Sequence, residues 1–166
     1  MTEYHQDPQK EQVEPPLPPV RAFHREEPGF RWHDVPVLAY KPNDTHFQGI
    51  TRQVLFDDPD HLACQLRYFE VQPGGYSSLE KHEHTHAVMI LRGRGRVLIG
   101  EAVHPVAAFD LVYIPSMTWH QFRTDDPDGL GFLCLVPCDR DRPIRPEPAD
   151  LERLRIHPSL SAFIRV

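Results

Sequence analysis

The sequence predicts an all-β protein, an antiparallel sandwich or barrel made of eight short strands. Two observations lead to this fold class. Segments rich in Val, Ile, Leu, Phe and Tyr recur through the middle of the chain, with turn signals roughly every 8–12 residues. Prolines stand at the ends of these segments, where a missing N–H group removes no hydrogen bond from the sheet. The length of 166 residues, with 40% hydrophobic and 25% charged residues, fits one globular domain.

The expected strands follow one another through the middle of the chain. Each ends at a Gly, a Pro or an Asp-rich cluster, the residue types that favour turns. Gly93 and Gly95 separate two neighbouring segments and predict a hairpin between them. The predicted strand ranges are 51–56, 64–71, 87–91, 96–99, 102–106, 111–114, 119–124 and 130–136.

Composition also sets the expected organisation of the chain. The run from Pro15 to Pro19 favours polyproline II structure, which forms no internal hydrogen bonds. The next segment carries Phe23, Phe30 and Trp32, aromatic side chains that require burial. We therefore divide the chain into four parts. Residues 1–20 form a disordered or extended Pro-rich arm, and residues 21–46 form an arm that packs on the core or on a partner. Residues 47–137 form the barrel, and residues 138–166 form an extension with short helices.

Charge and cysteine content argue against several classes of protein. The chain has 18 basic and 24 acidic residues, a formal net charge of -6, which disfavours nucleic-acid binding. No apolar run approaches the roughly 20 residues of a membrane span, and the first residues do not resemble a secretory signal. Three cysteines are an odd number, which fits free thiols in a reducing compartment. We expect a cytoplasmic protein that binds neither nucleic acid nor membrane.

One segment concentrates residues that bind metal ions. Glu80, His82, His84 and His86 alternate, so an extended chain would place all four on one face. Neutral imidazole is the commonest metal ligand in proteins, and carboxylate often accompanies it. A straight strand would hold Glu80 and His86 roughly 20 Å apart, so the chain must bend before both can share one ion. The alternative is that these histidines form only a solvated polar face.

A helical zinc site is a second alternative for the same residues. His82, Glu83 and His86 also satisfy the H-E-x-x-H pattern, in which two histidines one helical turn apart bind zinc. The glycines and prolines on both sides punctuate the chain at strand lengths, which favours strands over a helix here.

The spacing of these residues resembles the first motif of the cupin superfamily. Cupins have a Gly, five residues, His-x-His, three or four residues, Glu, six residues and Gly. Here the same spacing joins Gly74, Glu80, His82, His86 and Gly93. Glu80 stands where the family has its first His, and His86 stands where it has Glu. With His120 from the second motif, the sequence keeps the family's inventory of three His and one Glu, with two positions exchanged.

The second cupin motif is matched in part. The family has a Gly, five residues, Pro-x-Gly, two residues, His, three residues and Asn. Pro115 and His120 keep their places, while Phe109, Met117 and Thr124 replace the two Gly and the Asn. The resemblance extends over residues 47–137 and implies a double-stranded β-helix, the cupin jelly-roll barrel.

The resemblance implies a metal centre and a range of activities. It implies that Glu80, His82, His86 and His120 converge on one divalent ion, with His84 as an alternative ligand to Glu80. Imidazole and carboxylate suit Fe, Mn, Ni, Cu or Zn. The expected function is a metal-dependent oxidoreductase of dioxygenase type acting on a small organic molecule. The alternatives are a Lewis-acid isomerase or lyase and a non-catalytic sensing module. A homodimer is expected, since small cupins commonly pair.

Further residues are candidates for contacts around the metal or the substrate. Tyr68 could present a hydroxyl inside the barrel, Tyr76 lies just before the ligands, and Gln121 follows His120. Arg52 or Arg67 could hold a substrate carboxylate through two parallel hydrogen bonds. Each of the five also has an ordinary explanation as a packing aromatic or a surface polar group.

Overall fold

The computed structural model describes residues 22–24, 29–41, 44–57 and 62–166, so the arm expected at 1–20 lies outside the described residues. It confirms the all-β class with a few short helices. Its strands are β1 (Leu38–Ala39), β2 (Gln48–Asp57), β3 (Cys64–Tyr76), β4 (His86–Ile99), β5 (Ala102–Ala107), β6 (Leu111–Ile114), β7 (His120–Arg123) and β8 (Leu130–Pro137). The helices are α1 (Pro148–Leu154) and α2 (Pro158–Phe163).

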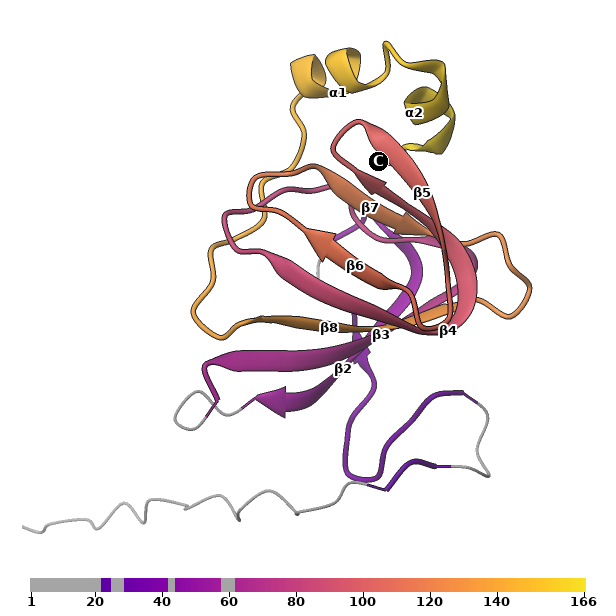
Figure 1. Ribbon diagram of the computed structural model, residues 1–166, viewed down its shortest axis with the longest axis vertical. Coiled ribbons are helices and arrows are strands. Elements are labelled where there is room, and N and C mark those ends of the chain that lie inside the picture. The colour runs from indigo at the N-terminus through magenta and orange to yellow at the C-terminus, as the bar shows by residue number, and fades with distance from the viewer. Residues whose placement is uncertain (1–21, 25–28, 42–43, 58–61) are drawn as a thin grey trace, which may run out of the picture.

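The strands close into an antiparallel barrel (Figure 1). Strand β8 lies between β3 and β4 and pairs with both of them. Strand β7 also pairs with both, at the other ends of these two long strands. Strands β2 and β1 extend the sheet beyond β3, while β5 and β6 pair with β4. This closure confirms the jelly-roll barrel that the motif spacing implied.

The hairpin expected at Gly93 and Gly95 is wrong, because β4 runs through both glycines as one strand. Its first half pairs with β6 and β8, and its second half pairs with β5 and β7. Glycine lets the strand pass close to neighbouring backbone at this crossing, where the register shifts between Ile90 and Arg92. The hairpin instead lies at Gly100 and Glu101, between β4 and β5.

Strand parity decides which side chains face the barrel interior. On β3, Phe69 and Val71 belong to the main core, so Arg67 shares their inward face. On β4, Val88 and Ile90 are buried in the same core, which places His86 on the inward face as well. The interior is therefore apolar along most of its length and carries charged and imidazole groups toward one end.

The segment before the barrel packs on the outer face of β3. The rings of Phe30 and Trp32 lie 5.7 and 5.3 Å from the ring of Tyr68, measured between centroids. Val35 and Leu55 complete this small cluster. Phe30 and Trp32 thus cover the barrel of their own chain.

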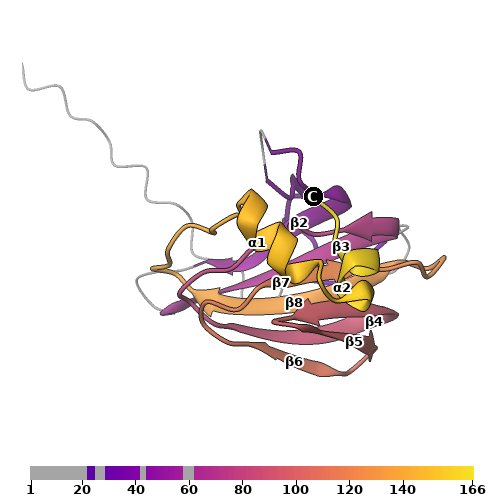
Figure 2. The same ribbon diagram turned by 90° about the horizontal axis from the view of Figure 1, so that it is seen from above.

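The two short helices form a separate apolar cluster at one end of the barrel, near β5 and β7 (Figure 1 and Figure 2). Leu154, Leu160 and Phe163 pack there against Leu98 and Trp119 of the barrel. Each helix has proline in its first turn, where an N–H group would have no helical partner. The helices thus cover an outward face of β4, since Leu98 has the opposite parity to Val97 of the main core.

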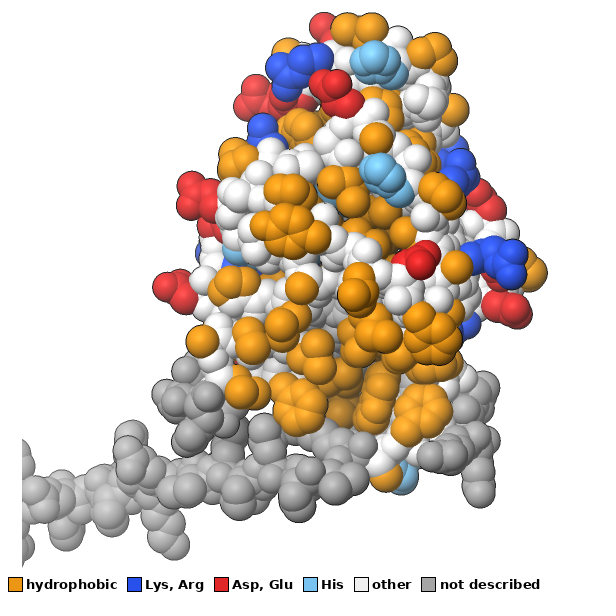
Figure 3. Space-filling model, in the orientation of Figure 1, with side chains coloured by type: hydrophobic (Ala, Val, Ile, Leu, Met, Phe, Trp, Pro, Cys, Tyr) orange, Lys and Arg blue, Asp and Glu red, His pale blue; other side chains and the backbone are white. Residues whose placement is uncertain are grey.

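One face of the barrel exposes apolar side chains over β4, β6 and β8, and Figure 3 shows them gathered there. Leu111, Tyr113 and Leu135 are 80%, 63% and 39% exposed. Patches of this kind are typical of association sites. None of the helices in the described part of the chain is long and apolar enough to cross a bilayer.

Candidate metal centre

The segment from Glu80 to His86 bends sharply and contains no helix. Glu80 pairs with His120 through two backbone hydrogen bonds, of 3.2 and 3.0 Å, and His86 begins β4. Between them the backbone carbonyl of His82 accepts a 2.7 Å hydrogen bond from the N–H of Met117. The helical zinc site is therefore wrong, and the bend required for a shared ion is present.

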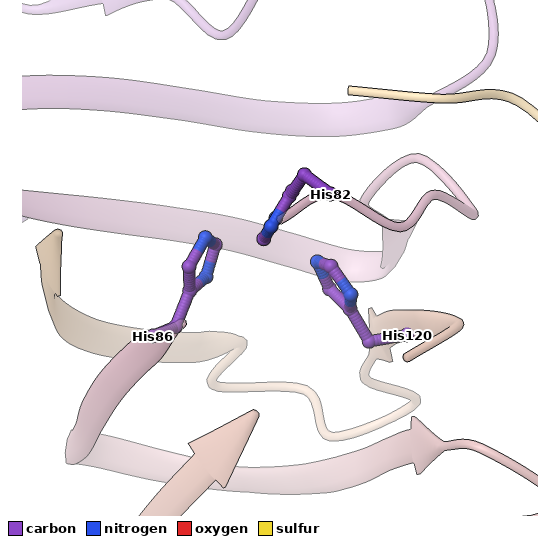
Figure 4. A group of neighbouring side chains, drawn as sticks. All are labelled: His82, His86 and His120. Atoms are coloured by element: carbon purple, nitrogen blue, oxygen red, sulfur yellow. The ribbon is translucent and has the colours of Figure 1, made fainter. Parts of the chain in front are cut away.

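Three histidines converge at this bend (Figure 4). His82 comes from the loop, His86 from the start of β4 and His120 from the start of β7. One ring nitrogen from each lies within 4.8 Å of the others. All three point into the pocket at the end of the barrel, and their nitrogens are the donors that divalent transition ions prefer.

The outer nitrogens of these rings have partners that orient them. His82 Nδ1 lies 2.7 Å from the carbonyl of His84, and His120 Nδ1 lies 3.0 Å from the carbonyl of Thr118. A carbonyl only accepts, so each Nδ1 carries the proton and each Nε2 keeps its lone pair. His82 Nε2 is buried and has no hydrogen-bond partner. A buried lone pair without a partner fits a metal ligand.

Burial keeps these rings neutral. Desolvation, followed by the neighbouring rings, lowers the pKa of His82 and of His86 below the usual value. Burial also lowers the pKa of His120, to about 3. Neutral imidazole is the form that binds metal ions, so the cluster is in its ligating form at neutral pH.

Glu80 lies in the same pocket but is not one of the three converging groups. Its carboxylate is buried and accepts a hydrogen bond from Lys41 Nζ. Burial lowers the pKa of Lys41, and the Glu80 carboxylate opposes that effect. Glu80 would have to exchange or share this partner to bind an ion.

His84, the alternative ligand, lines the same pocket and is held there by Asp141. Its ring stacks on His82 at 3.7 Å, and its Nδ1 lies 2.6 Å from Asp141 Oδ1. Its Nε2 lies 3.2 Å from His86 Nε2, so it borders the cluster. Asp141 also accepts hydrogen bonds of 2.7 and 3.1 Å from the N–H groups of Glu83 and His84. Although partial burial opposes ionisation, these hydrogen bonds hold the pKa of Asp141 well below its usual range.

Asp141 should therefore act as a positioning residue for the ligand loop. We expect Asp141→Ala to lower the metal affinity about 10- to 100-fold, which is the usual effect of removing a residue that hydrogen-bonds and orients metal ligands. Competition with a metal chelator measures this affinity. Asp139→Ala, a change at a nearby exposed residue, is the matched control and should bind metal as the unmodified protein does. Equal affinities in the two variants would contradict the role given to Asp141.

The pocket around the histidines has about 670 Å³ of empty space, part of it open to solvent. Phe69, Phe122 and Phe132 form its apolar wall. Both arginines suggested by the sequence, Arg52 and Arg67, line it. A pocket with an apolar wall and a few convergent polar groups is typical of a small-molecule site.

The other three candidates from the sequence lie elsewhere. Tyr68 is on the outward face of β3 and donates a hydrogen bond to Glu70, because parity turns it away from the interior. Burial raises its pKa to about 12. Tyr76 pairs with Arg123 at the end of β3. Gln121 is fully buried and binds the C-terminal segment through the carbonyl of Arg165, at 2.7 Å. The expectation that Tyr68 presents its hydroxyl inside the barrel is corrected, and none of these three residues lines the pocket.

Several lining residues were not found from the sequence: Tyr40, Lys41, Cys134, Arg140 and Asp141. Tyr40 and Lys41 precede the barrel in sequence, and Arg140 and Asp141 follow it. No local pattern marks them, since only the path of the chain brings them to the pocket. Cys134 alone had a signal, because the alternation along β8 places it between Phe132 and Val136 on the inward face.

Two departures from the second cupin motif keep a glycine-like backbone. Phe109 has φ 76° and Met117 has φ 55°, in the left-handed region that glycine occupies most easily. The turn at Met117 holds the loop of His82 through the hydrogen bond described above. The shape of these turns is thus kept although the residues differ from the motif.

The comparison with known proteins agrees with this architecture. Residues 67–136 match the cupin domain family. A relative from Rhodospirillum rubrum, named 1-methylthio-D-xylulose 5-phosphate methylsulfurylase, is 49% identical over 147 residues, covering 88% of this chain and 92% of the relative. The chain belongs to the cupin superfamily.

Solved structures show the same relationship. A cupin 2 conserved barrel domain protein from Rhodopseudomonas palustris is 52% identical with a TM-score of 0.80, covering 87% of this chain and 99% of that one. A cupin-2 domain protein from Rhodospirillum rubrum is 48% identical with a TM-score of 0.76, covering 90% of this chain and 96% of that one. The similarity extends well beyond the two motifs and includes most of the described chain.

Proposed function

We propose that this protein is a metal-dependent enzyme that transfers the methylthio group of a methylthio-substituted ketose phosphate to a thiol. The C–S bond of the sugar breaks, the thiol sulfur and the methylthio sulfur form a disulfide, and the sugar carbon gains the proton of the thiol. The 49% identity to the Rhodospirillum rubrum relative, over nearly the full length of both chains, carries this proposal. The substrate in the name of that relative is a five-carbon keto sugar with a phosphate at one end and a methylthio group at the other. The pocket, with cationic and imidazole groups around an apolar wall, suits such a molecule.

We further propose that His82, His86 and His120 hold one divalent ion, completed by Glu80 or His84. The orphaned lone pair of His82 Nε2 supports this set. An ion bound there would supply Lewis-acid polarisation of a substrate carbonyl beside the carbon that carries sulfur. The carbonyl partners of Nδ1 orient the rings of His82 and His120, and the three phenylalanines would limit water around the reacting carbons of a bound substrate.

Turnover of the synthetic substrate tests the proposal. We expect protein loaded with one of Mn, Fe, Ni, Cu or Zn to consume 1-methylthio-D-xylulose 5-phosphate, seen as loss of its S-methyl signal by proton NMR. Parallel reactions without O₂ supply water alone or a small thiol as co-reactant. The metal-free protein and the His120→Ala variant are the controls. Consumption in none of the reactions would reject the proposal.

A dioxygenase remains the second candidate, because three histidines with one further ligand leave open positions on a six-coordinate ion. An oxygen electrode separates the two, since a dioxygenase consumes O₂ in proportion to substrate. A sensing module would bind the sugar phosphate without consuming it. Each hypothesis predicts a different pair of results from the same two measurements.

We also propose that the protein is a cytoplasmic homodimer. The apolar face over β4, β6 and β8 supports the pairing, since Leu111 and Tyr113 would otherwise remain in water. Sedimentation at several protein concentrations gives the oligomeric state directly.

A further inference from the structure

The pocket contains three arginines that no described carboxylate neutralises directly. Arg52 and Arg67 enter from β2 and β3, and Arg140 enters from the segment after β8. Arg52 lies opposite Phe69 and Arg67 lies opposite Val54, so the two arginines are diagonal neighbours on the inward face. Their long side chains reach the same space within the barrel.

The guanidinium groups of Arg52 and Arg67 have incomplete polar contacts, and Arg67 Nη2 lies 3.5 Å from Cys134 Sγ. Arg140 donates to Gln65 Oε1 at 3.1 Å and to two backbone carbonyls at 3.2 and 3.4 Å. The Nε atoms of both Arg52 and Arg67 are buried without any hydrogen-bond partner. A buried donor without an acceptor is costly, which points to an acceptor supplied by a ligand.

Several arginines outside the pocket differ in having a carboxylate partner within 4.0 Å. Arg92 pairs with Glu70, and further ion pairs in the described chain are Arg94–Asp126, Arg96–Asp125, Arg123–Asp125, Arg145–Asp44 and Arg153–Asp150. The carboxylates that line the pocket are already engaged, Glu80 by Lys41 and Asp141 by His84. Positive charge at the pocket arginines is therefore in excess.

The three groups also repel one another. Burial, and then the charge of Arg67, lowers the pKa of Arg52 and likewise that of Arg140. The carboxylate of Asp57 opposes part of this effect at longer range. Arginine nevertheless stays charged at neutral pH, so the repulsion persists until an anion enters.

We propose that Arg52, Arg67 and Arg140 bind the phosphate group of a small phosphomonoester. Guanidinium groups match phosphate oxygens through paired N–H donors, which a compact ammonium group cannot do. The site lies beside the candidate metal centre, because Cys134 Sγ is 3.5 Å from Arg67 Nη2 and 3.6 Å from His86 Nδ1. A phosphate held there would direct the other end of the substrate toward the histidines. The inference rests on the proposed function only in taking a sugar phosphate as that substrate.

Calorimetric titration of the full chain tests this site, with D-xylulose 5-phosphate, D-xylulose and inorganic phosphate as probes. We expect the phosphate ester to bind at least about tenfold more tightly than D-xylulose. Arg52→Gln and Arg67→Gln should each weaken the ester about 10- to 100-fold and leave D-xylulose unchanged. Arg153→Gln, at an exposed arginine of α1, is the matched control and should bind as the unmodified chain does.

Two further variants keep the test decisive. His120→Ala retains the arginines but lacks a candidate metal ligand. A phosphate ester that still binds this variant is therefore not held by the metal ion. Arg67→Lys keeps the charge without the paired donors and should show an intermediate loss. If Arg67→Gln does not fold, Arg140→Gln takes its place, and we expect the same loss of ester affinity.

Equal affinity for the ester and the free sugar, or full ester affinity in the glutamine variants, would overturn the phosphate site. The outcome is separable from the proposed function. Ester binding that depends on the arginines, without turnover of the methylthio compound, would support the site and reject the activity. Turnover with an unchanged KM in the arginine variants would retain the activity and reject the site.

Discussion

Replacement of His82, His86 or His120 by alanine is expected to abolish stoichiometric metal binding. Each change removes one of three nitrogens that lie within 4.8 Å of one another. Loss of a ligand should lower the metal affinity by more than the roughly 10- to 100-fold that follows loss of a ligand's hydrogen-bond partner. Elemental analysis of protein purified without added metal should give about one ion per unmodified chain and less than a tenth of that in the variants.

The controls for this experiment also decide the fourth ligand. His104→Ala changes an exposed histidine of β5 and should leave metal content unchanged. Glu80→Gln and His84→Ala are measured beside it. If His84→Ala empties the site and Glu80→Gln does not, the ligand is His84 and the register taken from the cupin motif is wrong. Full metal content in all three histidine variants would reject the centre.

Gly93→Ala is expected to cause a large loss of stability. Gly93 has φ 69°, and a Cβ atom there would lie 2.0 Å from the carbonyl oxygen of Gly129. The contact is with backbone where β4 meets β8, so no side chain can turn aside. Strain of the left-handed backbone costs about 1–2 kcal/mol and overpacking about 1–3 kcal/mol, so the free energy of unfolding should fall by roughly 2–5 kcal/mol.

Gly74→Ala separates the two contributions. Gly74 has a similar φ of 73°, but a Cβ atom there would meet nothing within 4 Å. Its substitution should therefore cost only the backbone strain, about 1–2 kcal/mol. Denaturant unfolding of both variants measures the difference. Equal losses in the two would show that the crossing of β4 and β8 relaxes freely, contrary to this prediction.

The candidate site shows how far the sequence could be interpreted. The alternation of Glu80, His82, His84 and His86 required a bend, and the cupin spacing connected His120 to that bend. Both features are local patterns of residue type, so the sequence alone is enough to recognise them. The positions of the side chains relative to one another are not local, because Lys41 and Asp141 come from outside the motif and engage Glu80 and His84.

The alternation of side chains along β3 shows the same limit of the sequence. The sequence indicated that side chains on β3 alternate between two faces, but not which face would be enclosed. We expected Tyr68 inside, whereas the barrel closes over Phe69 and Val71 and leaves Tyr68 to the aromatic cluster outside. Arg67 is inside for the same reason. The choice depends on which face finds apolar partners across the whole barrel, and no single strand contains that information.

The strand-rich composition, most of the turns and the residue types able to bind a metal ion are all recognisable in the sequence alone. The continuity of β4 as one strand depends on tertiary contacts, since its two halves have different partners. It also decided that Arg140, far from Arg52 in sequence, shares a pocket with it. The physical reason is that turns and ligand types are set by neighbouring residues, whereas enclosure and charge clustering arise from contacts between distant segments.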